Sequence, residues 1–392
     1  MEMKLSNQNR IASIDLLRGI VMVIMALDHV RDYFHYDAYF FAPTDLSQTN
    51  VALFFTRFIT HFCAPAFVFL AGTSAFFVGQ RRNKKELSIW LFKRGLWLII
   101  VELTIMKLAW NFKLDYSYLA LQVIWILGVA MVFLSIFIHV PKKSMIIISL
   151  VVIFGHNAFD SYSPVILNKL WTMLHIQGPI VTDINTIFIA YPLIPWIFVM
   201  PLGYHFGMFY RQDFNAELRK KWLRYLGVGL IALFILIRAI NIYGDPNLWS
   251  NNGSMVFTFL SFLNVSKYPP SLLFLLVTLG PTILLLSFAE NWKGKIHDAV
   301  VTVGRVPMFF YIIHVYIIHL FALLAVVALG YSPKLMIIDI FVTLTPELQG
   351  YGFSLWVVYT VWILLVLGLY PICKWYWNYK NNNRDKWWLS YL

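Results

Sequence analysis

Ten long apolar segments constrain the fold of this 392-residue chain more than any other feature. About 20 apolar residues in a helix cross the hydrocarbon core of a bilayer. Hydrophobic residues make up 60% of the chain and charged residues only 13%, whereas soluble domains carry about 25% charge. We therefore predict an all-α, polytopic membrane protein that forms a single domain over residues 1–392. The ten predicted spans are 11–33, 51–79, 88–110, 118–140, 144–160, 186–210, 223–243, 269–289, 303–329 and 352–375.

Basic residues are distributed unevenly between these segments. If the N-terminus is cytoplasmic, the cytoplasmic segments hold 21 of the 31 Lys and Arg residues. The segments on the other side hold four, namely Lys113, Lys169, Lys267 and Lys334. Cytoplasmic loops carry such an excess of positive charge, so both termini are predicted to be cytoplasmic. The same distribution accounts for the net charge of +12 without a nucleic-acid partner.

The N-terminal start, the cysteines and the motif content argue against a cleaved signal peptide, a disulfide and a metal site. The basic start "MEMKLSNQNRIAS" leads into an apolar run, but no small-residue cleavage site follows, so we interpret 11–33 as a retained first span. Cys63 and Cys373 both lie in apolar segments, which predicts neither a disulfide nor a metal-binding cysteine pair. Phosphate-binding, dinucleotide-binding and HExxH motifs are absent from the sequence, so we expect no metal site.

The first span ends in a group of ionisable residues within "VMVIMALDHVRDYFHYD". An ionisable side chain in hydrocarbon costs about 2.5–3.5 kcal/mol on insertion scales, so such residues usually face a cavity or one another. Asp32 lies three residues after His29 and is expected to accept a hydrogen bond from one of its ring nitrogens. The other nitrogen is then available to take a proton from a substrate. We therefore select His29, Asp28 and Asp32 as candidate catalytic residues, with a purely structural ion-pair network as the alternative.

Other polar residues are expected at matching depths in other spans. The second span returns inward and brings Arg57 and His61 to the depth of the first group. Lys267 is the only basic residue of its loop, at the start of the eighth span. The candidate substrate-binding residues are Arg57, His61, Lys267, Tyr311 and His314. Arg18 and Arg305 instead lie toward the cytoplasmic ends of their spans.

Five motifs together resemble a known family. They are "RIASIDLLRGIVMVIMALDH", "TRFITHFCAPAFVFLAGTSAFF", "YPLIPWIFVMPLGYHFG", "KYPPSLLFLL" and "GRVPMFFYIIHVYIIH". The chain resembles, over residues 10–392, the bacterial multi-span proteins related to heparan-alpha-glucosaminide N-acetyltransferase. This resemblance implies a transmembrane acyltransferase, which takes acetyl from acetyl-CoA and passes it to a glucosamine amino group on the non-cytoplasmic side.

The resemblance also implies roles for particular residues. In the wider acyltransferase group, an Arg early in the first span is followed eleven positions later by an essential His, and Arg18 and His29 have that spacing. The lysosomal enzyme departs from this pattern, because it has Asn where Asp28 stands and its catalytic His lies beyond the span. His35 is therefore a competitor of His29 for the catalytic role.

These observations lead to one hypothesis and one alternative. The hypothesis is transfer of an acyl group from cytoplasmic acyl-CoA, with acetyl-CoA as donor, to a sugar amine or hydroxyl at the outer face of a bacterial inner membrane. Arg18 and Arg305 would bind the CoA phosphates, unless Arg18 only pairs with Asp15. The alternative is a transporter or flippase for a charged or glycan-like solute, which buried charges also suit. Whether the protein forms oligomers is left open.

Overall fold

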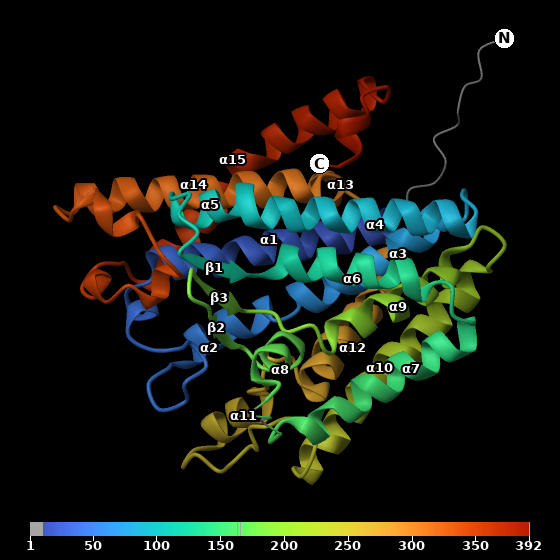
Figure 1. Cartoon of the computed structure of the whole chain (residues 1–392), viewed down its shortest axis with the longest axis horizontal. Coiled ribbons are helices and arrows are strands. Elements are labelled where there is room, and N and C mark those ends of the chain that lie inside the picture. Colours follow the sequence, from blue (N-terminus) through green and yellow to red (C-terminus); the bar gives the residue numbers. More distant parts are fainter. Residues whose placement is uncertain (1–10, 163, 165, 392) are drawn as a thin grey trace.

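The computed structural model describes residues 11–162, 164 and 166–391 and is mostly helical (Figure 1). Each of the ten predicted spans contains a helix. The first five spans contain α1 (Ala12–Phe34), α2 (Val51–Thr60) with α3 (Cys63–Gly79), α4 (Lys84–Val101), α6 (Val123–Phe137) and α7 (Lys142–Gly155) with η3 (His156–Phe159). Helix α4 continues through the π-helical η2 (Glu102–Met106) into α5 (Lys107–Asn111). The last five spans contain α9 (Trp196–Phe206) with η4 (Gly207–Tyr210), α10 (Ala216–Ile240), α12 (Leu272–Ala289), α14 (Pro307–Ala328) and α15 (Leu355–Asn382). The other helices are η1 (Tyr36–Tyr39), α8 (Asn168–Leu174), α11 (Met255–Leu263), α13 (Lys295–Arg305), η5 (Pro333–Met336), η6 (Val342–Leu344), η7 (Pro346–Leu348) and η8 (Trp387–Ser390).

Within the described part of the chain, six helical segments are long and apolar enough to cross a membrane. They are Val51–Gly79, Lys142–Phe159, Ala216–Ile240, Leu272–Ala289, Pro307–Ala328 and Leu355–Asn382. This finding supports a multi-pass membrane protein. The helices in the other predicted spans do not meet the requirements of length and apolar composition. Helices α1 and α4 carry many charged residues, while α6, with 15 residues, and α9, with 11, are too short. The number of ten spans therefore stays a prediction.

A small sheet corrects the all-α prediction at two places. Strands β1 (Tyr118–Leu121), β2 (Gly178–Val181) and β3 (Thr186–Ile189) form a sheet of order β1-β3-β2, in which β3 is parallel to β1 and antiparallel to β2. The predicted spans 118–140 and 186–210 therefore begin as strands and become helical only further along. Short apolar runs do not distinguish a buried strand from a helix, which explains the error.

Helix α1 lies at the centre of the molecule. It packs against α2, α3, α12, α13, α14 and α15, and most of its side chains are buried. Because charged side chains are costly against lipid, a helix that carries Asp28, Arg31 and Asp32 is stable in a membrane only where protein surrounds it. The sequence of α1 thus accounts for its central position.

Glycines let several helix pairs approach closely. A Cβ added at Gly72 of α3 would lie 2.0 Å from a backbone oxygen of α9, and one added at Gly203 of α9 would lie 2.0 Å from a backbone oxygen of α3. Gly19 of α1 and Gly304 of α13 form a similar reciprocal contact. Small residues at such crossings bring backbones together, which is how membrane helices gain packing energy in lipid.

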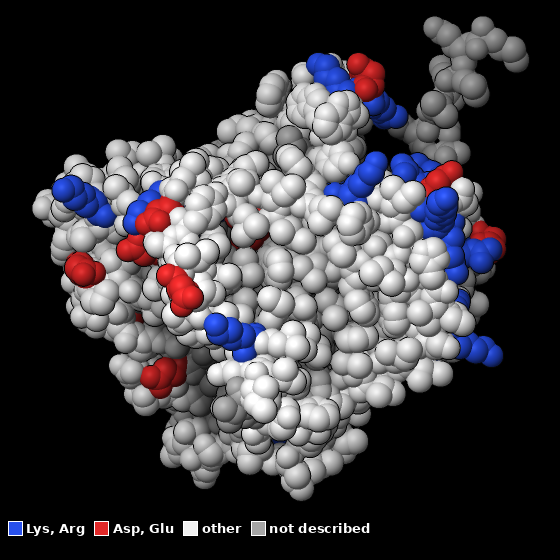
Figure 2. Space-filling model, in the orientation of Figure 1, with Lys and Arg blue, Asp and Glu red and all other residues white. Residues whose placement is uncertain are grey.

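Charged residues distinguish the two ends of the molecule. Lys and Arg side chains gather at the right-hand end of Figure 2, whereas acidic side chains are more frequent at the left. The right-hand end, where α1, α4 and α10 begin, is called the basic end here. The opposite end holds the C-terminal end of α1 and the three-stranded sheet. This separation agrees with the predicted orientation, in which the basic end is cytoplasmic.

Cysteine labelling tests the predicted orientation. Gln48 and Lys84 are exposed and lie at opposite ends of the segment formed by α2 and α3, while both native cysteines are buried and should give little background. A membrane-impermeant maleimide applied to intact spheroplasts should label Gln48→Cys, and it should label Lys84→Cys only after the membrane is opened. The reverse pattern would overturn the orientation.

Candidate functional site

A cavity of about 940 Å³ opens at the end of the molecule opposite the basic end. Its volume lies within the range of about 300–1,000 Å³ that is usual for ligand pockets. The C-terminal half of α1, the α2–α3 corner, the start of α14 and two loops, 264–268 and 340–349, contribute to its wall. The cavity is therefore built from segments far apart in the sequence.

Seven of the ten predicted site residues line this cavity. They are Asp28, His29, Asp32, Arg57, His61, Lys267 and Tyr311. His314 does not line it but contacts His29. The two remaining residues, Arg18 and Arg305, lie at the basic end, near the start of α1 and the end of α13. The structure thus brings together eight of the predicted residues and keeps the two arginines apart from them.

An ion-pair network joins Asp28 and Asp32, near the C-terminal end of α1, to two arginines. Asp28 receives a hydrogen bond from Arg57 and lies 2.7 Å from a terminal nitrogen of Arg31. Arg31 also donates to Asp32 Oδ1 at 2.5 Å. The Arg31 side chain is only 2% exposed, and a buried charge without a partner would be strongly destabilising. The carboxylates of Asp28 and Asp32 are therefore both engaged with arginines.

This arrangement corrects one expectation about His29. The predicted hydrogen bond from His29 to Asp32 is not made; instead, His29 Nδ1 lies 2.8 Å from Nε2 of His314. The two rings are nearly parallel, with centroids 5.0 Å apart. Trp110 packs edge-on against the His29 ring at 4.8 Å. His314, which the sequence analysis assigned to substrate binding, is thus the polar partner of His29.

The hydrogen bonds of His314 determine which nitrogen of His29 carries a proton. His314 Nδ1 lies 2.9 Å from the Phe310 carbonyl oxygen, which can only accept. Neutral His314 must therefore donate from Nδ1 and accept at Nε2. His29 then donates from its own Nδ1, and its Nε2 keeps a free lone pair. Among the described residues, His29 Nε2 has no hydrogen-bond partner, so it is available to a ligand in the cavity.

Lys267 is a positively charged group of the cavity without an ion-pair partner among the described residues. Its ammonium lies 5.2 Å from the centroid of the Tyr268 ring. Asp245 holds the chain on both sides of Lys267, because it accepts hydrogen bonds from the Ser266 backbone at 2.8 Å and from the Ser271 hydroxyl at 2.6 Å. Arg57 is already engaged by Asp28, so Lys267 is the better placed of the two to meet a negative charge on a ligand.

Several other cavity residues were not assigned a role from the sequence. Gln122 and Tyr191 follow the parallel strands β1 and β3, whose ends lie at the same edge of the sheet. The Tyr191 and Tyr268 hydroxyls lie 3.5 Å apart. Burial alone would raise the pKa of Tyr268, but the positive charges of Lys267 and Arg57 lower it overall. The parallel strands would have been the signal for Gln122 and Tyr191, but they were interpreted as helix.

His35, the competitor of His29, does not line the cavity. Its side chain is buried, and Nε2 lies 4.0 Å from a carboxylate oxygen of Asp37. The backbone of His35 pairs with Phe353 in an isolated bridge. The change from helix to extended backbone at His35 gives it an environment different from that of His29.

Arg18 and Arg305 are both close to Asp15 at the basic end. Arg18 donates to Asp15 at 2.9 Å, to the Ser74 hydroxyl at 3.0 Å and to the Gly304 carbonyl at 3.2 Å. Arg305 lies 3.8 Å from Asp15 and stacks over the Trp377 ring. Arg18 thus makes the pair with Asp15 that the sequence analysis gave as the structural alternative, whereas Arg305 is less completely engaged.

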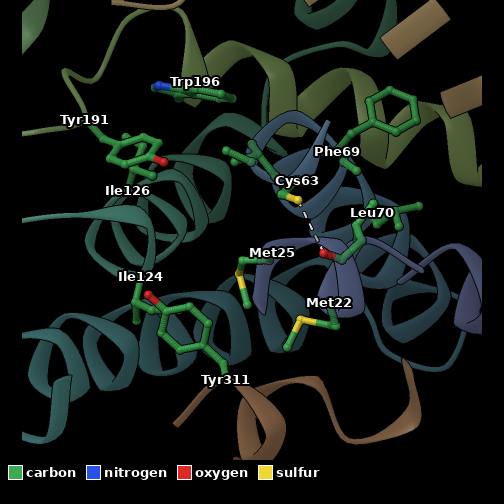
Figure 3. Close-up of a cluster of buried hydrophobic side chains, with 14 of the residues drawn as sticks. Met22, Met25, Cys63, Phe69, Leu70, Ile124, Ile126, Tyr191, Trp196 and Tyr311 are labelled. Carbon is green, nitrogen blue, oxygen red and sulfur yellow. Dashed lines mark hydrogen bonds between the residues drawn. The ribbon is translucent and has the colours of Figure 1, made fainter. Parts of the chain in front are cut away.

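An apolar cluster fills part of the space between the two ends. Figure 3 shows side chains from several helices converging there, among them Met22 and Met25 of α1, Cys63 and Leu70 of α3, Ile124 of α6 and Tyr311 of α14. The Cys63 thiol donates to the Val21 carbonyl at 3.3 Å (Figure 3). Met25, Cys63 and Tyr311 also line the cavity. One side of the cavity is therefore apolar, next to the charged residues of α1.

Comparison with known proteins identifies the family. The family model described as heparan-alpha-glucosaminide N-acetyltransferase, catalytic, matches residues 10–244, more than half of the chain. A search of curated proteins found no match. The matched part includes His29 and Arg57, while Lys267, Tyr311 and His314 lie beyond it. The chain belongs to the heparan-alpha-glucosaminide N-acetyltransferase catalytic family, and it is a membrane protein of transferase type.

Proposed function

We propose that this protein transfers an acyl group from acyl-CoA, with acetyl-CoA as the donor, to an amine or hydroxyl of a sugar bound in the cavity. The main support for this proposal is the position and hydrogen bonding of the His29 ring. Its ring lies on the cavity wall, Nδ1 is fixed by His314, and Nε2 has no partner among the described residues. A general base needs this combination of fixed orientation and a free lone pair.

The chemical step follows from these positions. The acceptor amine or hydroxyl attacks the thioester carbonyl, and His29 Nε2 takes the proton that the acceptor loses. The resulting oxyanion needs a donor, for which Lys267 and Tyr311 are candidates because both line the cavity. When the intermediate collapses, the carbon–sulfur bond breaks, and the CoA thiolate takes the proton back from His29. An acyl-histidine intermediate is a second route with the same products.

The acyl donor has to reach His29 from the basic end. Arg18 and His29 are eleven residues apart on one helix, about 16 Å at 1.5 Å per residue. Phosphates of CoA bound near Arg305 would leave the pantetheine arm to extend along α1 past Met22 and Met25. The apolar side chains in this region (Figure 3) suit the arm and a short acyl chain better than charged groups would.

The orientation and cell location complete the proposal. With 21 of 31 basic residues in the predicted cytoplasmic segments, the donor would bind from the cytoplasm, and the cavity would open on the outer face of a bacterial inner membrane. The transporter or flippase alternative is disfavoured by the family match, which is to a catalytic domain.

Replacement of His29 tests the proposed base. His29→Ala should lower turnover by 10²–10⁴-fold, because a positioned base contributes about that much. The measurement is release of CoA from acetyl-CoA by purified protein in liposomes, with a panel of amino sugars and neutral sugars as acceptors. His35→Ala is the matched control and should retain most activity. Loss of activity in His35→Ala alone would refute the assignment of His29.

Replacement of His314 tests the proposed positioning of His29. His314→Phe removes one hydrogen bond and should lower kcat about tenfold, since a neutral hydrogen bond contributes about 0.5–1.5 kcal/mol. His314→Gln should restore part of the loss, because its side-chain oxygen can accept from His29 Nδ1. KM for the acceptor should change little in either variant. A large increase in KM with unchanged kcat would instead assign His314 to substrate binding.

The donor site is tested at Arg305. Arg305→Gln should raise KM for acetyl-CoA by roughly 10- to 150-fold, which corresponds to the loss of one charge-assisted contact of about 1.5–3 kcal/mol. KM for the acceptor should stay nearly constant. Lys295→Gln, an exposed change on the same helix, is the control. Equal donor KM values in Arg305→Gln and the control would remove Arg305 from the donor site.

A further inference from the structure

A second group of polar residues lies apart from the cavity, at the end of α7 and after α8. It consists of His156, Asp160 and His175. Each residue offers one ligand atom, and these atoms all lie within 4.8 Å of one another. His175 Nε2 and Asp160 Oδ1 are 3.0 Å apart. None of the three lines the cavity, so they have no part in the acyl-transfer proposal.

His156 is the unexplained member of this group. It is 4% exposed, and neither of its ring nitrogens has a hydrogen-bond partner among the described residues. A buried polar group without a partner is unfavourable and uncommon in folded proteins. The ring lies 5.5 Å from the His175 ring, at a steep angle to it. A ligand that accepts a lone pair from His156 would remove this cost.

We propose that His156, Asp160 and His175 bind a Zn²⁺ ion. Imidazole nitrogens and a carboxylate oxygen are ligands that Zn²⁺ prefers, at bond lengths of about 2.0–2.2 Å. At these bond lengths, ligand atoms around a tetrahedral ion lie roughly 3.4 Å apart, so only small side-chain shifts would bring the three residues into a coordinating arrangement. Three protein ligands leave a fourth position for water.

The surroundings of Asp160 support this assignment. Asn157 donates from its side-chain nitrogen to Asp160 Oδ2 at 2.8 Å, which leaves Oδ1 directed at His175. Carboxylate ligands of metals are usually oriented by such a second hydrogen bond. The Asn157 side-chain oxygen also accepts from the Leu272 backbone at 2.9 Å, at the start of α12. The ion would therefore hold η3, the end of α8 and the start of α12 together.

Metal analysis of the purified full-length protein tests the site. After removal of any affinity tag, treatment with a chelator and dialysis against Zn²⁺, the protein should retain about one zinc per chain, as a single three-ligand site predicts. His156→Ala and His175→Ala should lose this zinc. His297→Ala is the control, because His297 also lies beside an aspartate, Asp298 at 2.9 Å, but without a second histidine. Asn157→Ala should weaken zinc binding by about 10- to 100-fold.

Two further readouts keep the test decisive if a variant fails to fold. With wild-type protein, Zn²⁺ added to the metal-free form should raise Tm, and Co²⁺ should give the visible absorption of a four-coordinate site. The proposal is overturned if metal-free wild-type protein takes up no zinc and shows no change in Tm. It is also overturned if folded His156→Ala or His175→Ala binds zinc as wild type does, because the zinc then lies elsewhere.

Discussion

The high cost of a charge in lipid is the constraint on which the rest of the structure depends. Helix α1 carries two acidic residues and an arginine near its C-terminal end, and it is stable only when other helices surround it. The helices packed around α1 do so, and Arg57 from one of them, α2, completes the pairing of Asp28. The central position of α1 and the charged wall of the cavity are thus two results of one electrostatic requirement.

Close helix packing makes this arrangement possible. Glycines at the α1–α13 and α3–α9 crossings allow backbones to touch, and α14 and α2, which are next to α13 and α3 in the chain, also pack against α1. His314 of α14 then reaches His29, and Arg57 of α2 reaches Asp28. Side chains as far apart in the sequence as His29 and Tyr311 share one cavity wall because both helices lie against each other. The site therefore depends on packing far from the cavity as well as on its own residues.

Much of the fold and part of the site could be predicted from the sequence. The apolar segments coincide with helices, because length and hydrophobicity are sufficient to identify such helices. Depth along each span grouped His29 with Arg57 and His61, Lys267 was selected as the only basic residue of its loop, and these residues do line one cavity. The strands at 118–121 and 186–189 were missed, because short apolar runs suit both structures. The predicted His29–Asp32 hydrogen bond was wrong, because the spacing on one helix does not reveal that Arg31 engages Asp32 and that His314 of α14 reaches His29.

The sequence by itself determined that this is a membrane protein and which residues are too polar to face lipid, and it predicted where along its helix each of them lies. These properties follow from composition and from the regular rise of a helix, so no neighbours are needed to derive them. Only the tertiary structure decided which polar residues meet. It placed His314 beside His29 and Arg57 beside Asp28, and it kept His35 out of the cavity. It also brought His156, Asp160 and His175 together. The reason is that pairing depends on how each helix is rotated and which helix lies beside it, and the packing of the whole chain sets both.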